Sequence, residues 1–499
     1  MTSQQRARFM STLIPAALLA AIAAGCGDGQ DPGADGETGG GGGSVGDVTG
    51  TVSTTFVTEQ GDIMVPEDLS DKLIFALHQN AKGEWWSTTG VGKTDGSFTI
   101  PGVPEGPFFL HVGFHEYYTA AREIAFSSYQ AGRADRVTPK KEVTITAQMT
   151  GLAPWAATDW LWWFAGNAGS SAPVIVSSQL GLGDTALDGF TIPWERHDLV
   201  DASKGDTLYF TQLSRHPGAE GAAYSTINRF ARFDDVTMVD GATTAVTGTF
   251  DQAVSHQSVA IDFRASEFMS AGTAINPDAE VVTRPLLRVS TRPGASKHGE
   301  LGYDASLVEV SPNAMHADPK LGTIDFDNPY PASWGAYGAA YVDVDVKYTV
   351  PGAEKTLGLT AEVAMTADLA TLGAGPIRPP VTPVQAPTLN GQSALHPLVG
   401  ITTTPTLSWS PPVVGSPRVY FIAIFDVNEL EDGTQAFFYR GGFDTSETSV
   451  PIPPGRLEEG KPHVFQISAV VDPAVDPSHP DEQSVNHAIA TALTSLVVP

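Results

Sequence analysis

Short runs in which apolar and polar residues alternate recur along the whole chain. The clearest is 340–350 (AYVDVDVKYTV), where one face carries Val342, Val344, Val346 and Tyr348 and the other carries Asp343, Asp345 and Lys347. A period of two residues predicts a half-buried β-strand. Similar runs lie at 207–213, 258–263, 285–291 and 357–365. Because no segment has a persuasive 3.6-residue apolar period, the pattern predicts an all-β fold of tandem β-sandwich domains.

The first predicted module, residues 46–150, contains a strong hairpin signal. Residues 94–112 read TDGSFTIPGVPEGPFFLHV, in which Asp95-Gly96 is a typical hairpin turn and Phe98 and Ile100 share a face. The run resembles the "DG-x-F-x-I-x-x-V-P-x-G-x-Y-x-L-x-V" signature of the carboxypeptidase-regulatory-like, transthyretin-like domain, with a Phe at the Tyr position. The resemblance implies a small seven-stranded sandwich that serves as a non-catalytic accessory module.

The last predicted module, residues 388–499, carries a second resemblance. TLSWSPP at 406–412 is followed by apolar runs at 420–426 and 464–470. These runs, with Leu457 and Gly460 ahead of the third, resemble a fibronectin type III domain, although His463 replaces the family's corner tyrosine. The resemblance implies a sandwich in which Trp409 is the buried core indole, packed against Tyr420 or Ile422 and Phe465 or Ile467.

The region between these modules matches no family signature. Residues 151–372 form an uncharacterised β-rich domain, long enough for one large sandwich or two small ones. Residues 373–387 (GAGPIRPPVTPVQAP) are rich in proline, which predicts a comparatively stiff linker before the last module.

The N-terminus has the features of an export signal. Arg6 and Arg8 precede a short apolar run at 13–24, which ends in Ala23-Ala24-Gly25-Cys26. This ending resembles the lipobox of bacterial lipoproteins, which implies a signal peptide over 1–25 and a lipid anchor on Cys26. Cys26 is the only cysteine of the chain, so no disulfide framework exists. Residues 26–45 therefore form the lipidated cysteine and a flexible glycine-rich tether.

The net charge limits the classes of partner that the chain can bind. The chain has 28 basic and 56 acidic residues, and removing Arg6 and Arg8 with the signal leaves a net charge of 26 − 56 = −30. Such a surface repels nucleic acid and anionic headgroups. We therefore expect no nucleic-acid partner, and membrane attachment through the lipid on Cys26 alone.

Sequence motifs for catalysis or nucleotide binding occur in the wrong context. GGSVG at 42–46 fits the G-x-S-x-G expression but lies in the tether, where no strand-to-helix elbow can form. GLGDTA at 181–186 resembles a dinucleotide loop but lacks a surrounding βαβ unit. We expect no cofactor.

Two groups of polar residues have incomplete metal-ligand patterns. His111 and His115, with Glu116, could share one strand face, but no third or fourth ligand is evident nearby. Asp325, Asp327 and Asn328 could contact Ca²⁺, but the spacing of an EF-hand is absent. Exposed strand or loop positions explain both groups better, so no metal site is expected.

Six tryptophans fall into two groups, Trp85 with Trp86, and Trp155, Trp160, Trp162 and Trp163. Exposed aromatic rings stack on sugars or partner side chains, whereas buried rings fill a core. Because adjacent residues of a strand point to opposite faces, one of Trp162 and Trp163 is a candidate for exposure.

Two functions fit these observations. The first is a non-catalytic, membrane-anchored surface lipoprotein of the bacterial outer membrane with a binding, adhesive or scaffolding role, whose partner is an envelope protein or polysaccharide. The alternative is an envelope-anchored hydrolase, either a glycoside hydrolase or an esterase, with its site in the middle domain. Its candidate carboxylates are Glu195, Asp198, Asp234 and Asp235. A carboxylate pair facing a cleft would favour the enzyme.

Overall fold

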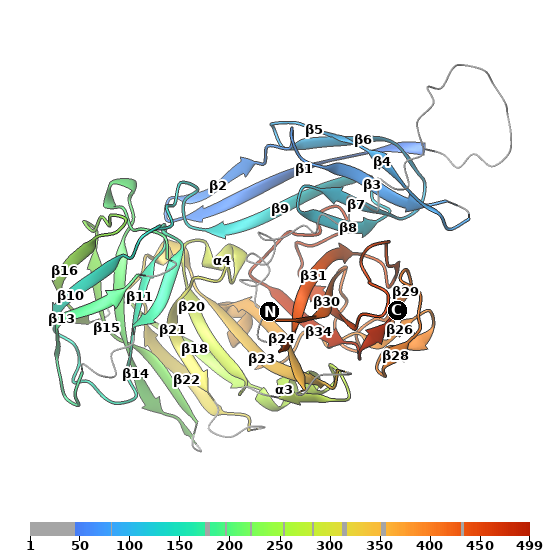
Figure 1. Cartoon of the computed structure of the whole chain (residues 1–499). Helices are drawn as coiled ribbons and strands as arrows, with labels where there is room; N and C mark the ends of the chain where they lie inside the picture. The colour runs from blue at the N-terminus through green and yellow to red at the C-terminus, as the bar shows by residue number, and fades with distance from the viewer. Residues whose placement is uncertain are drawn as a thin grey trace.

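The computed structural model describes residues 45–80, 82–174, 180–194, 197–219, 222–252, 255–281, 284–311, 317–350, 356–430 and 434–499. Strands dominate these residues, and the longest described helix has only nine, so the all-β fold class is confirmed. The strands form four β-sandwiches (Figure 1). The predicted signal peptide, Cys26, the predicted tether up to residue 44, and Glu195 lie outside the described residues.

The N-terminal sandwich begins at the first described residue. One sheet contains β1 (Val45–Thr58), β2 (Gly61–Pro66), β5 (Val91–Gly92), β6 (Ser97–Pro104) and β9 (Glu123–Ala131). The other contains β3 (Ile74–Gln79), β4 (Trp85–Thr89), β7 (Phe108–Val112) and β8 (His115–Thr119). Val52, Phe98 and Leu110 pack between the sheets. The turn predicted at Asp95-Gly96 joins β5 to β6, and Gly96 has the left-handed φ of +79° that such a turn requires.

The first middle sandwich packs two sheets around Trp163. One sheet contains β10 (Thr144–Thr150), β13 (Ala186–Pro193) and β16 (Thr243–Thr249). The other contains β11 (Trp160–Ala165), β12 (Ser170–Val174), β14 (Leu208–Pro217), β15 (Ala223–Phe233) and the short β17 (Asp251–Gln252). The predicted N-terminal module, residues 46–150, includes β10. In the structure Ile145 and Met149 pack with Trp163, so the N-terminal sandwich ends with β9.

The second middle sandwich contains the clearest predicted strand. Its large sheet contains β19 (Ala279–Val281), β20 (Leu286–Thr291), β21 (Ala305–Ser311), β23 (Tyr337–Tyr348) and β24 (Leu357–Asp368). Its small sheet contains β18 (His256–Phe263), β22 (Lys320–Asp327) and β25 (Pro376–Ile377). Val342, Val344 and Val346 are fully buried on one face of β23, as the alternation predicts.

The helices are short and lie beside the strands. They are η1 (Ala202–Lys204), α3 (Ala265–Thr273), α4 (Ala295–His298), η3 (Ala332–Trp334) and α5 (Leu369–Gly373). The sequence pattern does not predict α3, which packs on β23 at Gly272. A Cβ at Gly272 would lie 2.7 Å from Val344, so glycine permits this close approach.

The C-terminal sandwich encloses Trp409. Its small sheet contains β26 (Gln385–Leu389), β27 (Gln392–Ser393), β29 (Thr406–Ser410) and β32 (Ser449–Pro451). The facing strands are β28 (Leu398–Val399), β30 (Val419–Glu429), β31 (Gln435–Thr445), β33 (His463–Val471), β34 (His487–Leu493) and β35 (Val497–Val498). Trp409 is 6% exposed and meets the Tyr420 ring edge-on at 5.2 Å, so its predicted burial against Tyr420 is confirmed.

The proline-rich segment at 373–387 is folded onto its neighbours. Its strand β25 pairs with β18, and Ile377, Val381 and Val384 are buried in the core. The expected linker is therefore packed between the second middle and C-terminal sandwiches.

One sheet runs without a break through all four sandwiches. Antiparallel pairs β15–β21 and β24–β34 join the two middle sandwiches and the C-terminal sandwich in series. The parallel pair β31–β8 then joins the C-terminal to the N-terminal sandwich. The N-terminal sandwich also contacts the first middle sandwich, and Figure 1 shows it lying across the other three. The N-terminal sandwich thus joins the two ends of the series, so the four sandwiches close a ring. It also contacts the second middle sandwich, where Asp62 pairs with Lys297 and His298.

Candidate functional site

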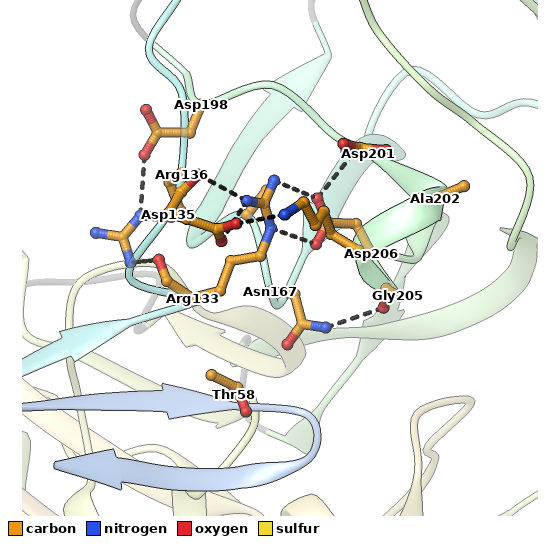
Figure 2. A network of polar contacts seen from close by, with 12 residues as sticks. Thr58, Arg133, Asp135, Arg136, Asn167, Asp198, Asp201, Ala202, Gly205 and Asp206 are labelled. Atoms are coloured by element: carbon orange, nitrogen blue, oxygen red, sulfur yellow. Dashed lines mark hydrogen bonds and ion pairs between the residues drawn. The ribbon is translucent and has the colours of Figure 1, made fainter.

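The ring closes at a buried polar contact, which we call the hairpin junction. It comprises Glu59 and Gln60 in the β1–β2 turn, with Arg133, Asn167, Asp206, Arg232 and Asp234 around them. Figure 2 shows Arg133, Asn167 and Asp206 of this junction, with Arg136 and Asp198 beside them and the β1–β2 hairpin below. Its residues come from turns and from the end of β15, far apart in sequence, so the fold alone brings them together.

Asn167 joins three segments at this junction. Its side chain lies in the turn between β11 and β12 and is 1% exposed. Its Oδ1 accepts a hydrogen bond from the Glu59 backbone N at 2.8 Å, and its Nδ2 donates to Gln60 Oε1 at 3.2 Å and to the Gly205 carbonyl at 2.9 Å. One amide thus uses its acceptor and both donors across the ring closure.

Arg133 and Asp206 form the principal ion pair. The Arg133 Nε and Nη2 atoms donate to the two Asp206 carboxylate oxygens at 2.9 and 3.0 Å. The Asp206 side chain has no exposed surface, and its Oδ2 also accepts from the Asp201 backbone N at 2.8 Å. Asp135 holds the same guanidinium at 2.7 Å. A bidentate pair with further hydrogen bonds compensates the loss of hydration.

Two glycines allow the backbone segments to approach this closely. A Cβ at Gly132 would lie 2.5 Å from the Asn167 carbonyl oxygen, and one at Gly169 would lie 2.3 Å from the Ala131 carbonyl oxygen. Both have positive φ, at +86° and +58°. These isolated glycines are the sequence signal of the junction, and the sequence pattern alone does not predict it.

Glu59 is the chemically unusual residue of the hairpin junction. Its Oε1 is buried and has no hydrogen-bond partner. Burial raises the pKa of this carboxyl to about 7, with the Arg232 guanidinium opposing the shift and the Asp206 and Asp234 carboxylates adding to it. Glu59 is thus partly protonated near neutral pH.

Aromatic rings form the floor beneath Glu59 and Arg232. The Arg232 guanidinium lies 5.8 Å from the centre of the Tyr209 ring, and its Nε is 2.9 Å from the Asp234 Oδ1. Tyr209 packs against Tyr330 and Trp334, at centroid distances of 4.9 and 5.9 Å. These rings are buried, so they anchor the junction to the core.

Three carboxylates at or beside the hairpin junction are paired with arginines, whereas the buried Glu59 Oε1 has no hydrogen-bond partner. Asp206 pairs with Arg133, and Asp234 pairs with Arg232. Asp198 is bound by Arg136 Nε at 3.0 Å and by Thr138 Oγ1 at 2.6 Å. Glycoside hydrolysis needs an acid and a second carboxylate that flank a substrate. The described geometry instead fits a structural clamp between two sandwiches.

The two candidate metal ligands His111 and His115 lie on different strands and opposite faces. They occupy β7 and β8, on either side of the turn at Gly113. His111 Nδ1 lies 3.3 Å from Glu116, whereas His115 stacks on Phe126 and contacts Asp481 at 3.0 Å. The expectation that they could share a face is wrong, because a hairpin separates them.

The candidate calcium ligands are also apart. Asp325 and Asp327 on β22 face His256 at 3.9 and 3.4 Å near the surface, whereas the buried Asn328 accepts a hydrogen bond from the Tyr330 backbone N. Within the described ranges, no three His, Cys, Asp or Glu side chains are grouped to hold a metal ion. The loop at 181–184 is a turn in which Asp184 accepts a hydrogen bond from the Gly181 backbone N at 2.7 Å.

The tryptophans divide between core and surface. Trp155 and Trp163 are buried, and Trp162 packs against the core from the opposite face of β11. Trp160 and Trp86 are 54% and 55% exposed. The exposed rings are thus Trp160 and Trp86, and the Trp162-Trp163 pair provides packing on both faces of its sheet.

The other end of the N-terminal sandwich forms the second contact of the ring, the strand junction. It contains the β8–β31 pair, where Tyr117 and Tyr118 oppose Asp444 and Thr445. Beside it, Glu116 is ion-paired with Arg456. Phe109 meets Phe443 edge-on at 5.0 Å, so apolar packing supports the strand pairing.

Comparisons with known proteins give little beyond this architecture. No protein-family model matches the chain, and no curated protein matches it. Among solved structures, a tetra-tandem repeat in the extending region of a large adhesion protein aligns at 12% identity and a TM-score of 0.11, covering 89% of this chain and 98% of that one. Trypsin-activated alpha-2-macroglobulin from Escherichia coli aligns at 10% identity and a TM-score of 0.12, covering 86% of this chain and 29% of that one. Scores this low carry no inference about function.

The class that the described residues define is thus an all-β protein of four sandwiches joined in a ring. None of its described helices combines the length and the apolar character needed to cross a bilayer.

Proposed function

We propose that this chain is an exported bacterial lipoprotein that is anchored through Cys26 and acts without catalysis, as a binding, adhesive or scaffolding component of the cell envelope. The observation that supports the non-catalytic role is the hairpin junction. Its carboxylates Asp206 and Asp234, and Asp198 beside them, are each paired with an arginine, and the Arg133–Asp206 pair joins two sandwiches.

The arrangement of the tether supports a surface role. The first strand starts at Val45, directly after the glycine-rich segment, and enters a sandwich that is fixed at both ends. A tether of the kind that the glycine-rich sequence predicts, followed by a closed ring, would present a folded body at a distance from the membrane. The net charge of −30 after signal removal would keep that body away from anionic headgroups.

The anchor is tested with Cys26→Ser. The thioether requires the Cys26 sulfur, so the variant should leave the membrane fraction and appear in the soluble or secreted fraction. Two or more acyl chains hold a protein stably, which makes the change close to complete. Detergent-phase partitioning of both forms measures it, and equal partitioning would contradict the lipoprotein assignment.

The binding role is tested with the same soluble variant. Immobilised Cys26→Ser protein should retain an envelope protein or polysaccharide from cell-envelope material, and Trp86 and Trp160 are the exposed rings to replace first. Hydrolysis of ester or glycoside substrates by the purified chain, lost in Asp234→Asn, would favour the hydrolase alternative.

A further inference from the structure

Strand β2 is an edge strand whose exposed residues are mainly apolar. Among the described strands it pairs only with β1, and all six of its residues are exposed. Ile63, Met64 and Val65 are 51%, 69% and 39% exposed. Figure 1 places β2 on the outer side of β1, away from β9. An apolar edge of this kind is a template for another strand.

The opposite edge of the same sheet, formed by β9, is covered by another segment of the chain. The β9 strand donates its Ala125 backbone N to the Ser478 carbonyl at 2.8 Å, so a C-terminal loop covers it. The β2 edge has no such cover, and its residues carry little charge. Asp62 is paired with Lys297 and His298 at 3.2 and 3.1 Å, and no charge occurs between Asp62 and Glu67. The usual protection of an edge by an unpaired charge is thus absent from 63–65.

The β2 sequence is complementary to itself in one antiparallel register. When Met64 opposes Met64 of a second copy, Ile63 opposes Val65, and Asp62 opposes Pro66. Apolar residues then face apolar residues, and no acid faces an acid across the pair. A two-fold axis through Met64 makes the contact isologous, as in most dimers.

We propose that β2 pairs edge to edge with β2 of a second copy of this chain, in the antiparallel register centred on Met64. The inference uses only described residues and does not depend on the anchor at Cys26. Six residues per strand make a small interface, so the dimer is weak and reversible in solution. Confinement to one membrane would raise its effective concentration.

Cysteine cross-linking tests the contact, in the full chain carrying Cys26→Ser so that no native thiol remains. Opposed residues in an antiparallel pair have Cβ atoms roughly 4.5–5.5 Å apart, close enough for thiols to meet. Met64→Cys should therefore form a disulfide-linked dimer at least about tenfold faster than Val91→Cys. Val91 is a matched control, because it is also 69% exposed and lies on β5 of the same sheet. Equal rates would overturn the proposal.

Mixed variants test the register. A mixture of Ile63→Cys and Val65→Cys chains should form the heterodimeric disulfide faster than either chain forms its own dimer, because only Ile63 and Val65 oppose each other. Equal heterodimer and homodimer rates would exclude this register.

Sedimentation equilibrium without cross-linking provides an independent measurement. The soluble Cys26→Ser chain, with no substitution in β2, should show reversible dimerisation that strengthens with NaCl, since salt screens the repulsion between two strongly acidic bodies. Met64→Lys, which places two ammonium groups across the axis, should abolish the dimer, and Val91→Lys should not. A monomer at every concentration, or a dimer unaffected by Met64→Lys, would refute the proposed pairing of β2 with β2. Capture of an unrelated extended peptide by the monomer would reassign the edge to another partner.

Discussion

Glu59 shows how one residue can make the stability of the fold depend on pH. Its carboxyl has a pKa near 7 in the folded chain, above the usual 4.5, because it is buried. The folded state therefore binds a proton more tightly than the unfolded state does. The free energy of unfolding then falls as the pH rises from about 4.5 through 7.

Replacing Glu59 with Gln should remove this dependence. The amide has nearly the same shape and no charge, and the Glu59 backbone N can still donate to Asn167. At pH 8 we expect Glu59→Gln to raise the free energy of unfolding by on the order of 3 kcal/mol, with little difference at pH 4. Denaturant titrations at the two pH values measure it, with the exposed Glu105→Gln as control. A variant less stable than the parent at pH 8 would show that the ionised carboxylate is stabilising.

His463 replaces a tyrosine expected from the fibronectin-like resemblance and makes an equivalent local contact. It is fully buried, and its Nε2 accepts a hydrogen bond from the Glu458 backbone N at 3.0 Å. Burial lowers its pKa, with Asp426 opposing the shift. The neutral imidazole thus closes the corner by accepting, whereas a tyrosine hydroxyl would donate.

At the scale of elements, local patterns predicted strands well and their partners poorly. The alternation at 340–350 corresponds to β23, and Asp95-Gly96 forms the predicted turn between β5 and β6. Strand β10 has equally clear alternation, but its pattern does not encode that β13 and β16 are its neighbours. Helix α3 was missed because its nine residues include small Ala271 and Gly272, which weaken the apolar period.

The hairpin junction was beyond the reach of sequence patterns for the same reason. Glu59 and Asn167 are 108 residues apart, and each resembles an ordinary polar turn residue. What makes them a site is burial and mutual orientation, which arise only when the ring closes. The separately predicted carboxylates Asp198 and Asp234 do lie nearby, but as partners of arginines.

The packing of β29 leads to a prediction about cooperativity. Trp409 lies in a core that continues from the second middle sandwich into the C-terminal one, and β34 pairs with both β24 and β33. Trp409→Ala should lower the free energy of unfolding by about 3–5 kcal/mol. Because the two sandwiches share a core and a sheet, calorimetry should show one lowered transition for both. Trp86→Ala, at an exposed indole, is the control and should change stability little. Separate transitions would mean that the C-terminal sandwich unfolds alone.

At the scale of the molecule, Arg133 controls whether the ring is closed. Arg133→Met would leave the fully buried Asp206 carboxylate without its cation, at a cost of about 3–5 kcal/mol. We expect faster hydrogen exchange at the β1–β2 turn and around Asn167, with exchange in β30 and β33 unchanged. Lys347→Met is the control, because it breaks an exposed ion pair with Glu280, and it should lower the free energy of unfolding by less than about 1 kcal/mol. Unaltered exchange at the turn would mean that other contacts hold the closure.

The parallel pairing of β1 with β9 has a mechanical consequence. Thr49 to Val57 of β1 lie beside Glu123 to Ala131 of β9, and Val45 is where the membrane tether would pull. A force along β1 loads its hydrogen bonds in shear, so the whole row must yield together. The same force applied across the strand would break the bonds one at a time. Under the anchoring proposed above, a body fixed at this strand would remain folded while the membrane and a bound partner are drawn apart.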